Sequence, residues 1–158
     1  MKQIHNSKGM GKMKAQYVGD FEQWRKDFKF QTEIRVRFSE TDMYGHVNNT
    51  VPFVYFEQAR IDYLNSLGVF NAEKAESSIL VVADLQCDFV KQVYFGETLH
   101  VMVKTASVGT SSMDLHYLAL NENKEAVFVG RGTLVLLDAA TGKGKALSEE
   151  EKQLLLGK

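Results

Sequence analysis

Residues 35–60 read RVRFSETDMYGHVNNTVPFVYFEQAR, and this stretch decides the fold. An alternating strand pattern leads into it and ends at Phe38, a polar turn follows, and a mostly apolar helical segment begins near Asn49. The first N–H groups of a helix have no partner within the helix and carry partial positive charge. A carboxylate held just before that end, here Asp42, therefore adjoins a site suited to a developing oxyanion.

The composition is that of an ordinary globular protein with one domain. The chain has 158 residues, of which 44% are hydrophobic and 25% charged. Its formal net charge of -1 argues against non-specific nucleic-acid binding, and neither a membrane span nor a secretory signal is visible. Cys87 is the single cysteine, which excludes an internal disulfide and is typical of a cytoplasmic protein. The four histidines show no ligand spacing, so we expect no metal site.

Both ends of the chain are expected to lie outside the main domain. Residues 1–29 should comprise a mobile, lysine-rich tail over 1–19 and a short helix that Asp20 caps. We expect this helix to pack at the edge of a sheet. Residues 141–158 should form a loop and a short helix, because Ser148–Glu151 has the spacing of a capping box.

Residues 30–140 are expected to form the main domain. The alternation from Phe30 to Phe38 predicts a first strand with one buried face. The segment from Asn49 to Leu67 is apolar around most of its circumference, which predicts an enclosed helix. Four further strand patterns follow at residues 81–89, 99–103, 113–119 and 125–138. Because short turns join antiparallel neighbours, we expect an α+β fold in which a five-stranded antiparallel sheet wraps around one long central helix.

Several of these segments resemble the hotdog-fold acyl-CoA thioesterases, and in particular the 4-hydroxybenzoyl-CoA thioesterase-like family. The resemblance covers residues 31–138, and it rests on ETDMYGHVNN, YFEQAR, YFGE and GTLVLLD. It implies a hotdog fold and a homodimer or homotetramer. It also implies a thioester substrate, acyl-CoA or an acyl-carrier-protein thioester, bound between the helix of one protomer and the sheet of the other, with no cofactor.

The same resemblance assigns residues to roles. Asp42 matches the catalytic carboxylate of the family, and Gly45 matches its tight-turn glycine. Asn49 falls where relatives place the backbone N–H that polarises the thioester carbonyl. Together with Gly45, the neighbouring residues His46 and Asn48 are expected to bind the substrate.

Two positions depart from a related branch that is linked to the cell-envelope Tol–Pal system. That branch has histidine where this chain has Asn49, and tyrosine where it has Phe38. A mechanism that uses a histidine at position 49 is therefore excluded here. His46 occupies a site that is usually aliphatic in those branches, so the resemblance assigns it no catalytic role.

Each assignment has a structural alternative. Asp42 has the position of an ordinary turn or capping acid, Asn49 that of a helix N-cap, and His46 that of a structural turn residue. Glu57 offers a second carboxylate on the helix, but its spacing to Arg60 favours an ion pair.

Thioester hydrolysis requires an activated water or an attacking carboxylate, and stabilisation of the oxyanion. Asp42 can serve as a general base or as a nucleophile that forms a mixed anhydride. Two other functions fit the same fold, namely an enoyl-thioester hydratase or dehydratase that uses Asp42 with His46, and a non-catalytic acyl-CoA-binding protein. The phosphates of CoA need cations, and the candidates are Lys91, Lys104, Arg131, Lys143 and Lys145.

Overall fold

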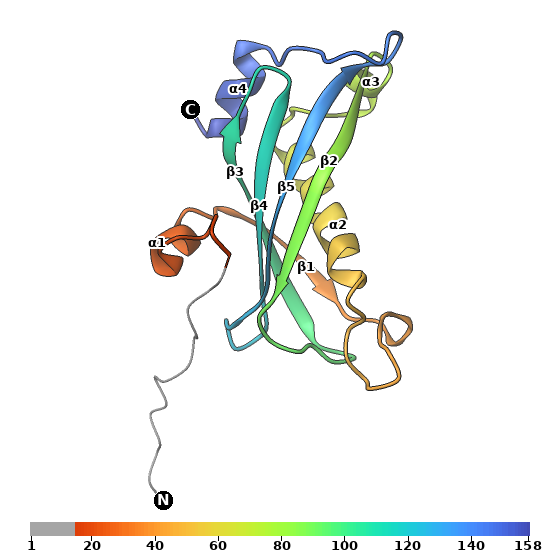
Figure 1. Ribbon diagram of the computed structural model, residues 1–158, viewed down its shortest axis with the longest axis vertical. Coiled ribbons are helices and arrows are strands. Elements are labelled where there is room, and N and C mark those ends of the chain that lie inside the picture. The colour runs from red at the N-terminus through yellow and green to blue at the C-terminus, as the bar shows by residue number, and fades with distance from the viewer. Residues whose placement is uncertain (1–14) are drawn as a thin grey trace, which may run out of the picture.

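The computed structural model describes residues 15–158 and has one antiparallel sheet of five strands in the order β1-β3-β4-β5-β2 (Figure 1). The strands are β1 (Phe30–Arg35), β2 (Ser78–Phe89), β3 (Thr98–Val108), β4 (Ser112–Leu120) and β5 (Ala126–Asp138). The helices are α1 (Phe21–Lys26), the 3₁₀ turn η1 (Phe38–Glu40), α2 (Val51–Ser66), α3 (Ala72–Ala75) and α4 (Glu149–Leu156). The expected α+β hotdog fold, with α2 as the main helix, is confirmed.

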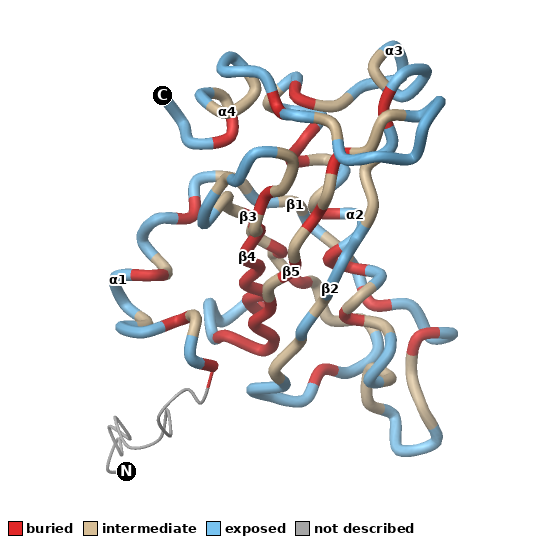
Figure 2. Tube along the Cα trace, turned by 45° about the horizontal axis from the view of Figure 1, so that its top comes forward, coloured by how far each residue is buried: buried red, intermediate tan, exposed pale blue. Residues whose placement is uncertain are grey.

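The helix α2 packs on the inner face of the sheet at close range. The ring of Phe56 stacks on Tyr117 of β4, with centroids 4.5 Å apart and planes 16° apart. This fit depends on Gly130 of β5, because a Cβ there would lie only 2.4 Å from the Phe56 ring. Buried residues gather along β4 and β5 under the helix (Figure 2). Each fully buried large apolar side chain contributes roughly 1.5–3 kcal/mol of transfer free energy.

One flank of α2 stays open, contrary to the expectation of an enclosed helix. The helix is also shorter than expected, since it begins at Val51 instead of Asn49 and ends at Ser66. Val54 and Ile61 are exposed on it. The sheet of one chain covers only one side of the helix, so no other part of the described chain covers these apolar side chains.

The first strand ends at Arg35, earlier than the alternation up to Phe38 indicated. The N–H of Val36 still donates to the Glu97 carbonyl oxygen at 2.9 Å. Hydrogen bonds between Arg37 and Glu40 then turn the chain into η1. Phe38 consequently lies 75% exposed, although its position in the pattern suggested burial.

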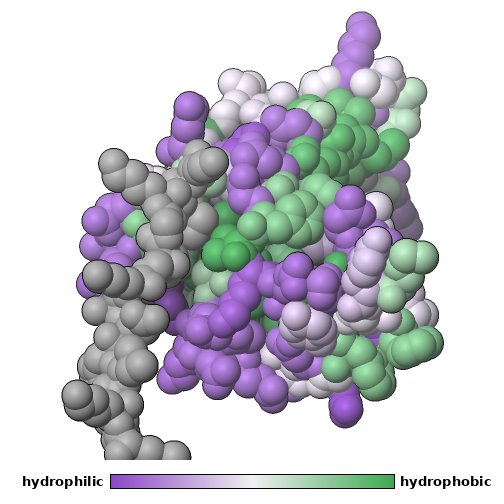
Figure 3. Space-filling view, turned by 60° about the horizontal axis from the view of Figure 1, so that its bottom comes forward, coloured by the Kyte–Doolittle hydropathy of each residue, from purple (hydrophilic) through white to green (hydrophobic). Residues whose placement is uncertain are grey.

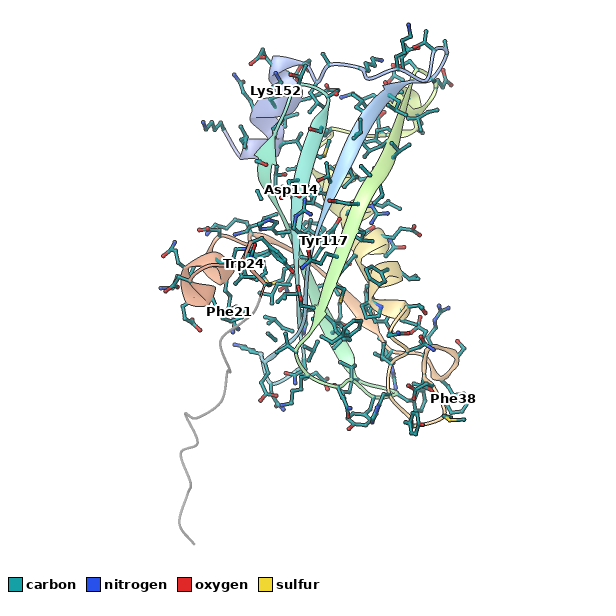
Figure 4. All side chains as sticks on the ribbon, in the orientation of Figure 1. Phe21, Trp24, Phe38, Asp114, Tyr117 and Lys152 are labelled. Atoms are coloured by element: carbon teal, nitrogen blue, oxygen red, sulfur yellow. The ribbon has the colours of Figure 1, made fainter. Side chains whose placement is uncertain are left out.

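The outer face of the sheet is covered by the N-terminal segment, so the expectation that α1 packs at the sheet edge is wrong. The indole N–H of Trp24 donates to Nδ1 of His116 on β4 at 2.9 Å. Figure 4 shows Trp24 between α1 and the sheet. The predicted Asp20 cap is confirmed. Ala15 and Val18 are buried, which contradicts a mobile tail at residues 15–19, while residues 1–14 lie outside the described part. This N-terminal segment therefore buries apolar side chains on the outer face of the sheet.

The strand β2 forms one edge of the sheet. It pairs with β5 on one side only, with a bulge between Val82 and Asp84.

At the other end of the chain, Ser148 and Glu151 make the predicted capping box of α4. Among residues 15–158, no helix combines the length and the apolarity needed to cross a bilayer.

Candidate active site

A buried carboxylate connects the loop before α2 to the helix itself. Glu40 accepts hydrogen bonds from the Arg37 N–H (2.9 Å), from the Arg37 Nε (3.0 Å) and from the Tyr55 hydroxyl (2.7 Å). Burial alone would raise the pKa of Glu40, but these donors outweigh it and hold that pKa below its usual value. This group was not predicted, since nothing in the spacing of Glu40 and Tyr55 indicates contact.

Asp42 lies half-buried in a tight turn just after this anchor. Its Oδ1 accepts from the backbone N–H groups of Tyr44 (2.8 Å) and His46 (3.2 Å). The Gly45 N–H donates to the Asp42 carbonyl oxygen at 3.0 Å, and Gly45 has a φ of +78°, which favours glycine. No residue in the described range donates to Asp42 Oδ2. The turn therefore orients the carboxylate and leaves one oxygen free.

The start of α2 is built by Asn48, so the interpretation of Asn49 as the N-cap is wrong. Asn48 Oδ1 accepts from the N–H and the hydroxyl of Thr50, each at 3.1 Å, and Thr50 is the N-cap residue. The Val51 N–H donates to the Asn48 carbonyl oxygen at 2.9 Å. No acceptor within residues 15–158 bonds the Asn49 N–H. The amide that the resemblance singled out is thus unpaired.

One pocket brings most of the predicted site residues together. Its volume is about 600 Å³, and its lining consists of Asp42, His46, Val47, Asn48, Asn49, Phe89, Val90, Lys91, Gln92, Val93 and Phe128. Gly45 is outside the lining and acts through the turn. Lys91 is the one candidate CoA-binding cation on this lining, and it pairs with Glu125 at 2.6 Å. Lys104 and Arg131 lie instead on the outer face of the sheet, bonded to the Trp24 carbonyl oxygen and to Asp114.

His46 contributes an aromatic wall to this end of the molecule. Its ring meets the Tyr94 ring edge-to-face, with centroids 5.0 Å apart. Among the described residues, its imidazole makes no hydrogen bond to the Asp42 carboxylate. Figure 3, which brings this end of the molecule forward, shows apolar side chains at the surface among polar ones, and Phe38, Met43 and Phe95 are exposed here. The end that holds Asp42 is less covered than the rest of the structure.

Two further groups have plain structural explanations. Glu57 Oε2 lies 3.7 Å from Arg60 Nη2, so the predicted ion pair is confirmed. Cys87 is half-buried against the core, and burial raises the pKa of its thiol to about 12. Within residues 15–158, no cluster of three or more His, Cys, Asp or Glu side chains could hold a metal ion.

A comparison with known families decides the class of this protein. A family model described as the thioesterase-like superfamily matches residues 36–155, a range that includes the whole pocket lining. The chain belongs to the thioesterase-like superfamily. Membership confirms the resemblance, and it identifies the enzyme class as a thioester hydrolase.

Several known proteins are similar to this chain, and two of them are named thioesterases. YsmA from Bacillus subtilis is 43% identical over 136 residues, which cover 86% of this chain and 91% of YsmA. The long-chain acyl-CoA thioesterase FadM from Escherichia coli is 27% identical over 79% of this chain and 96% of its own. A solved thioesterase from Thermus thermophilus, complexed with coenzyme A and Zn, is 31% identical with a TM-score of 0.70 over 81% of this chain and 98% of its own.

Proposed function

We propose that this thioesterase hydrolyses acyl-CoA and that Asp42 is its catalytic carboxylate. One observation carries the proposal, namely that the free Oδ2 of Asp42 and the unpaired N–H of Asn49 belong to residues that line the same pocket of about 600 Å³. FadM, by its name, acts on long-chain acyl-CoA, and the Thermus thermophilus relative was solved with coenzyme A. These two relatives support CoA as the carrier of the acyl group.

In the first form of the mechanism Asp42 is a general base. Its Oδ2 takes a proton from a water molecule, and the water oxygen attacks the thioester carbonyl carbon. The carbonyl oxygen becomes an oxyanion that accepts a hydrogen bond from the Asn49 N–H. Collapse of this intermediate breaks the carbon–sulfur bond, releases the CoA thiolate and leaves the free acid.

In the second form Asp42 is the nucleophile. Its Oδ2 attacks the thioester carbon, the CoA thiolate leaves, and a mixed anhydride joins Asp42 to the acyl group. Water then hydrolyses the anhydride and restores the carboxylate. The oxyanion that forms on the thioester carbonyl accepts from the Asn49 N–H in the same way.

The groups named are sufficient for an activated ester. General-base assistance typically supplies roughly 10²–10⁴-fold. One well-placed oxyanion donor supplies on the order of 10²–10³-fold.

Asp42→Asn tests the proposal, because asparagine keeps an oxygen for the Tyr44 and His46 N–H groups and loses the base. Release of thiol from a panel of acyl-CoAs should fall by roughly 10²–10⁴-fold. Asp20→Asn is the matched control, since asparagine caps α1 as well as aspartate does. Full turnover by Asp42→Asn would remove Asp42 from the mechanism. Loss of enoyl absorbance without free thiol would indicate a hydratase, and tight binding without turnover would indicate a non-catalytic protein.

Label that appears in Asp42 after a single turnover in ¹⁸O-labelled water identifies the nucleophile form of the mechanism. The base form places the label in the released acid, because the attacking oxygen comes from water. In the nucleophile form, the first turnover transfers an Asp42 oxygen to the product if water attacks the aspartyl carbon, and the label then appears in Asp42. Mass spectrometry of a peptide that contains Asp42 measures this.

We also propose that two copies associate along their β2 edges. Within the described chain the outer edge of β2 pairs with no strand, and exposed edges of this length are usually covered. Val54, Ile61 and Phe89 expose apolar side chains on α2 and β2. Such an interface would place the second copy beside the Asp42 pocket, which Phe89 lines.

Sedimentation of the wild type and of a Val54→Glu, Phe89→Glu double variant tests the association. The wild type should sediment as a dimer or a larger even assembly, and the double variant as a monomer with little thioesterase activity. A monomeric wild type that hydrolyses acyl-CoA would refute the dimer and leave the chemistry intact.

A further inference from the structure

A second cavity lies on the inner side of the sheet, between α2 and the edge strand β2. It has a volume of about 380 Å³, and α3 contributes to one end of it. It shares no lining residue with the Asp42 pocket. Most of its walls are apolar, and they include Ile61, Leu64, Phe70, Leu80, Val82 and Leu134. Such a groove suits a hydrocarbon chain.

One charged side chain interrupts this apolar lining. Arg60 is only 11% exposed, and its Nη1 is buried without a hydrogen-bond partner. Its Nη2 lies 3.7 Å from Glu57 Oε2, which is too far for a hydrogen bond, and the Glu57 side chain is mostly exposed. A buried guanidinium with so loose a partner is destabilising unless another acceptor reaches it.

The group beside Arg60 cannot neutralise it. The Tyr117 hydroxyl is buried and has no well-aligned hydrogen bond. Burial raises the pKa of Tyr117, and the nearby charge of Arg60 and its hydrogen bond to the hydroxyl oppose that effect without overcoming it. Tyr117 therefore stays neutral, and its oxygen accepts from the guanidinium without supplying a negative charge. The guanidinium still lacks a close anion on this side.

The proposed dimer brings this groove to the catalytic carboxylate. A two-fold axis between two β2 edges makes them antiparallel, so the start of one strand lies beside the end of the other. Leu80, near the start of β2, lines the groove, and Phe89, at its end, lines the Asp42 pocket. The groove of one copy thus faces the Asp42 pocket of the other.

From these observations, and building on the proposed thioesterase function, we propose that Arg60 selects acyl groups that carry a distal carboxylate. The substrates would be mono-CoA thioesters of dicarboxylic acids. The apolar walls hold the methylene chain, and the Arg60 fork meets the carboxylate, which matches guanidinium geometry. The pairing supplies the close anion that Glu57, 3.7 Å away and mostly exposed, does not provide. In a region of low dielectric such a charge-assisted hydrogen bond is strong.

Matched pairs of acyl-CoAs test this selection. Each pair has one chain length and differs only in whether the far end is a methyl or a carboxylate group. Wild-type kcat/KM should favour the carboxylate form at the best length. Arg60→Met, which keeps the bulk and removes the charge, should lower kcat/KM for that form by roughly ten- to a hundredfold. It should raise kcat/KM for the methyl form, because the chain no longer meets a bare cation.

Two further variants separate charge from folding. Arg60→Lys keeps the charge without the fork and should retain part of the preference. Glu57→Gln removes the competing carboxylate and should strengthen the preference. Arg25→Met makes the same change of net charge on α1, away from the groove. It should leave the ratio of kcat/KM for the carboxylate and methyl forms unaltered. A wild type that favours the methyl forms tenfold at every length would overturn the proposal even if Arg60→Met fails to fold.

A binding measurement keeps this inference distinct from the catalytic proposal. Calorimetry with free dicarboxylic acids, compared with monocarboxylic acids of equal length, reports the groove without any hydrolysis. Tighter binding of the dicarboxylic acid, lost in Arg60→Met, supports the role of Arg60 even if no thioester is cleaved. Hydrolysis without preference in either assay refutes the role of Arg60 alone. Arg60→Met could instead change the dissociation constant of the dimer and leave the ratio of kcat/KM for the carboxylate and methyl forms unchanged. That result assigns Arg60 to the contact between copies.

Discussion

An aspartate and a histidine occur close together in two regions, and the two regions differ in how many of their polar groups are paired. On the outer face of the sheet, His116 Nε2 lies 3.3 Å from Asp114 Oδ2, and the Trp24 N–H donates to His116 Nδ1. The proton of the neutral imidazole is therefore on Nε2. In the pocket before α2, the His46 N–H donates to Asp42 Oδ1 and the Asp42 N–H donates to the His46 carbonyl oxygen, whereas the His46 imidazole makes no hydrogen bond to the carboxylate within residues 15–158.

The difference shows that contact between an acid and a histidine is a poor guide to catalysis. Asp114 also binds Arg131, which in turn binds Asp84, so the outer cluster is a closed network under α1. Such a network stabilises a fold and leaves nothing for a substrate. The Asp42 pocket has the looser contacts and the unpaired groups, and chemistry needs both.

Replacing each of the two aspartates by asparagine is the sharpest test of this comparison. Asp42→Asn should lower kcat/KM by roughly 10²–10⁴-fold and change the free energy of unfolding by less than about 0.5 kcal/mol. Asp114→Asn should destabilise by roughly 1–3 kcal/mol, because Arg131 loses a buried anion, and should keep most of the activity. Thiol release and urea unfolding measure the two effects. Equal loss of activity in both variants would remove the distinction.

The anchor of the active loop should be nearly as sensitive. Tyr55→Phe removes a hydroxyl that donates to the buried Glu40 carboxylate at 2.7 Å. Hydrogen bonds to charged groups contribute about 1.5–3 kcal/mol, so the urea midpoint should fall accordingly. Tyr44→Phe is the control, because Tyr44 is exposed. Identical midpoints for the two variants would show that Glu40 does not depend on Tyr55.

A change in the contact between α1 and the sheet should lower the stability of the protein and leave its activity unchanged. Trp24→Phe keeps a ring over the sheet and leaves Nδ1 of His116 without its donor. We expect a loss of roughly 1–3 kcal/mol in unfolding free energy and an unchanged kcat/KM within about twofold. A large fall in kcat would mean that the outer face communicates with the Asp42 pocket.

Mild acid should weaken the outer face first. Burial lowers the pKa of His116, and this effect outweighs Asp114, which raises it. Between that lowered pKa and the unfolded value of about 6.5 the unfolded chain binds more protons, so stability falls as the pH drops below about 6.5. Trp24 is the single tryptophan, so its fluorescence reports undocking directly. His116→Gln should flatten the response in this window.

A second loss of stability should follow at lower pH from Glu40. Its folded pKa is held below the usual value, so its contribution is present above about pH 4.3 and disappears as the pH falls further. Urea midpoints measured across both windows, in wild type and in Tyr55→Phe, separate the two groups. The comparison fails if His116→Gln removes the lower transition instead.

Local patterns predicted much of the fold. Alternation and short turns indicated an antiparallel sheet, and the spacing at Asp20 and Ser148 indicated helix caps, because these features depend on near neighbours. The end of β1 was missed, since a bond between Arg37 and Glu40 overrides the alternation that Phe38 continues. The place of α1 was missed as well, because a short helix carries no mark of which face of a sheet it covers.

The candidate site divides in the same way. Asp42, His46, Asn48 and Asn49 are close in sequence, and the turn brings them to one pocket. Glu40 and Tyr55 are 15 residues apart, and only the folded loop makes them partners. The sequence does not show either that Arg60 is buried with only a distant carboxylate as its partner. The spacing of Arg60 to Glu57 predicts an ion pair but not how deeply the guanidinium is buried.

Gly130 has a consequence for how the family varies. Phe56 occupies the space that a side chain at position 130 would fill, so the separation of α2 from the sheet depends on that pair. A homologue with alanine at this position must carry a smaller residue opposite it or accept a more distant helix, and β2 must also shift, because the added Cβ would lie 2.7 Å from the Gln86 carbonyl oxygen. The two positions should therefore change together during evolution, and enzymes engineered for bulkier acyl groups can be sought by exchanging them jointly.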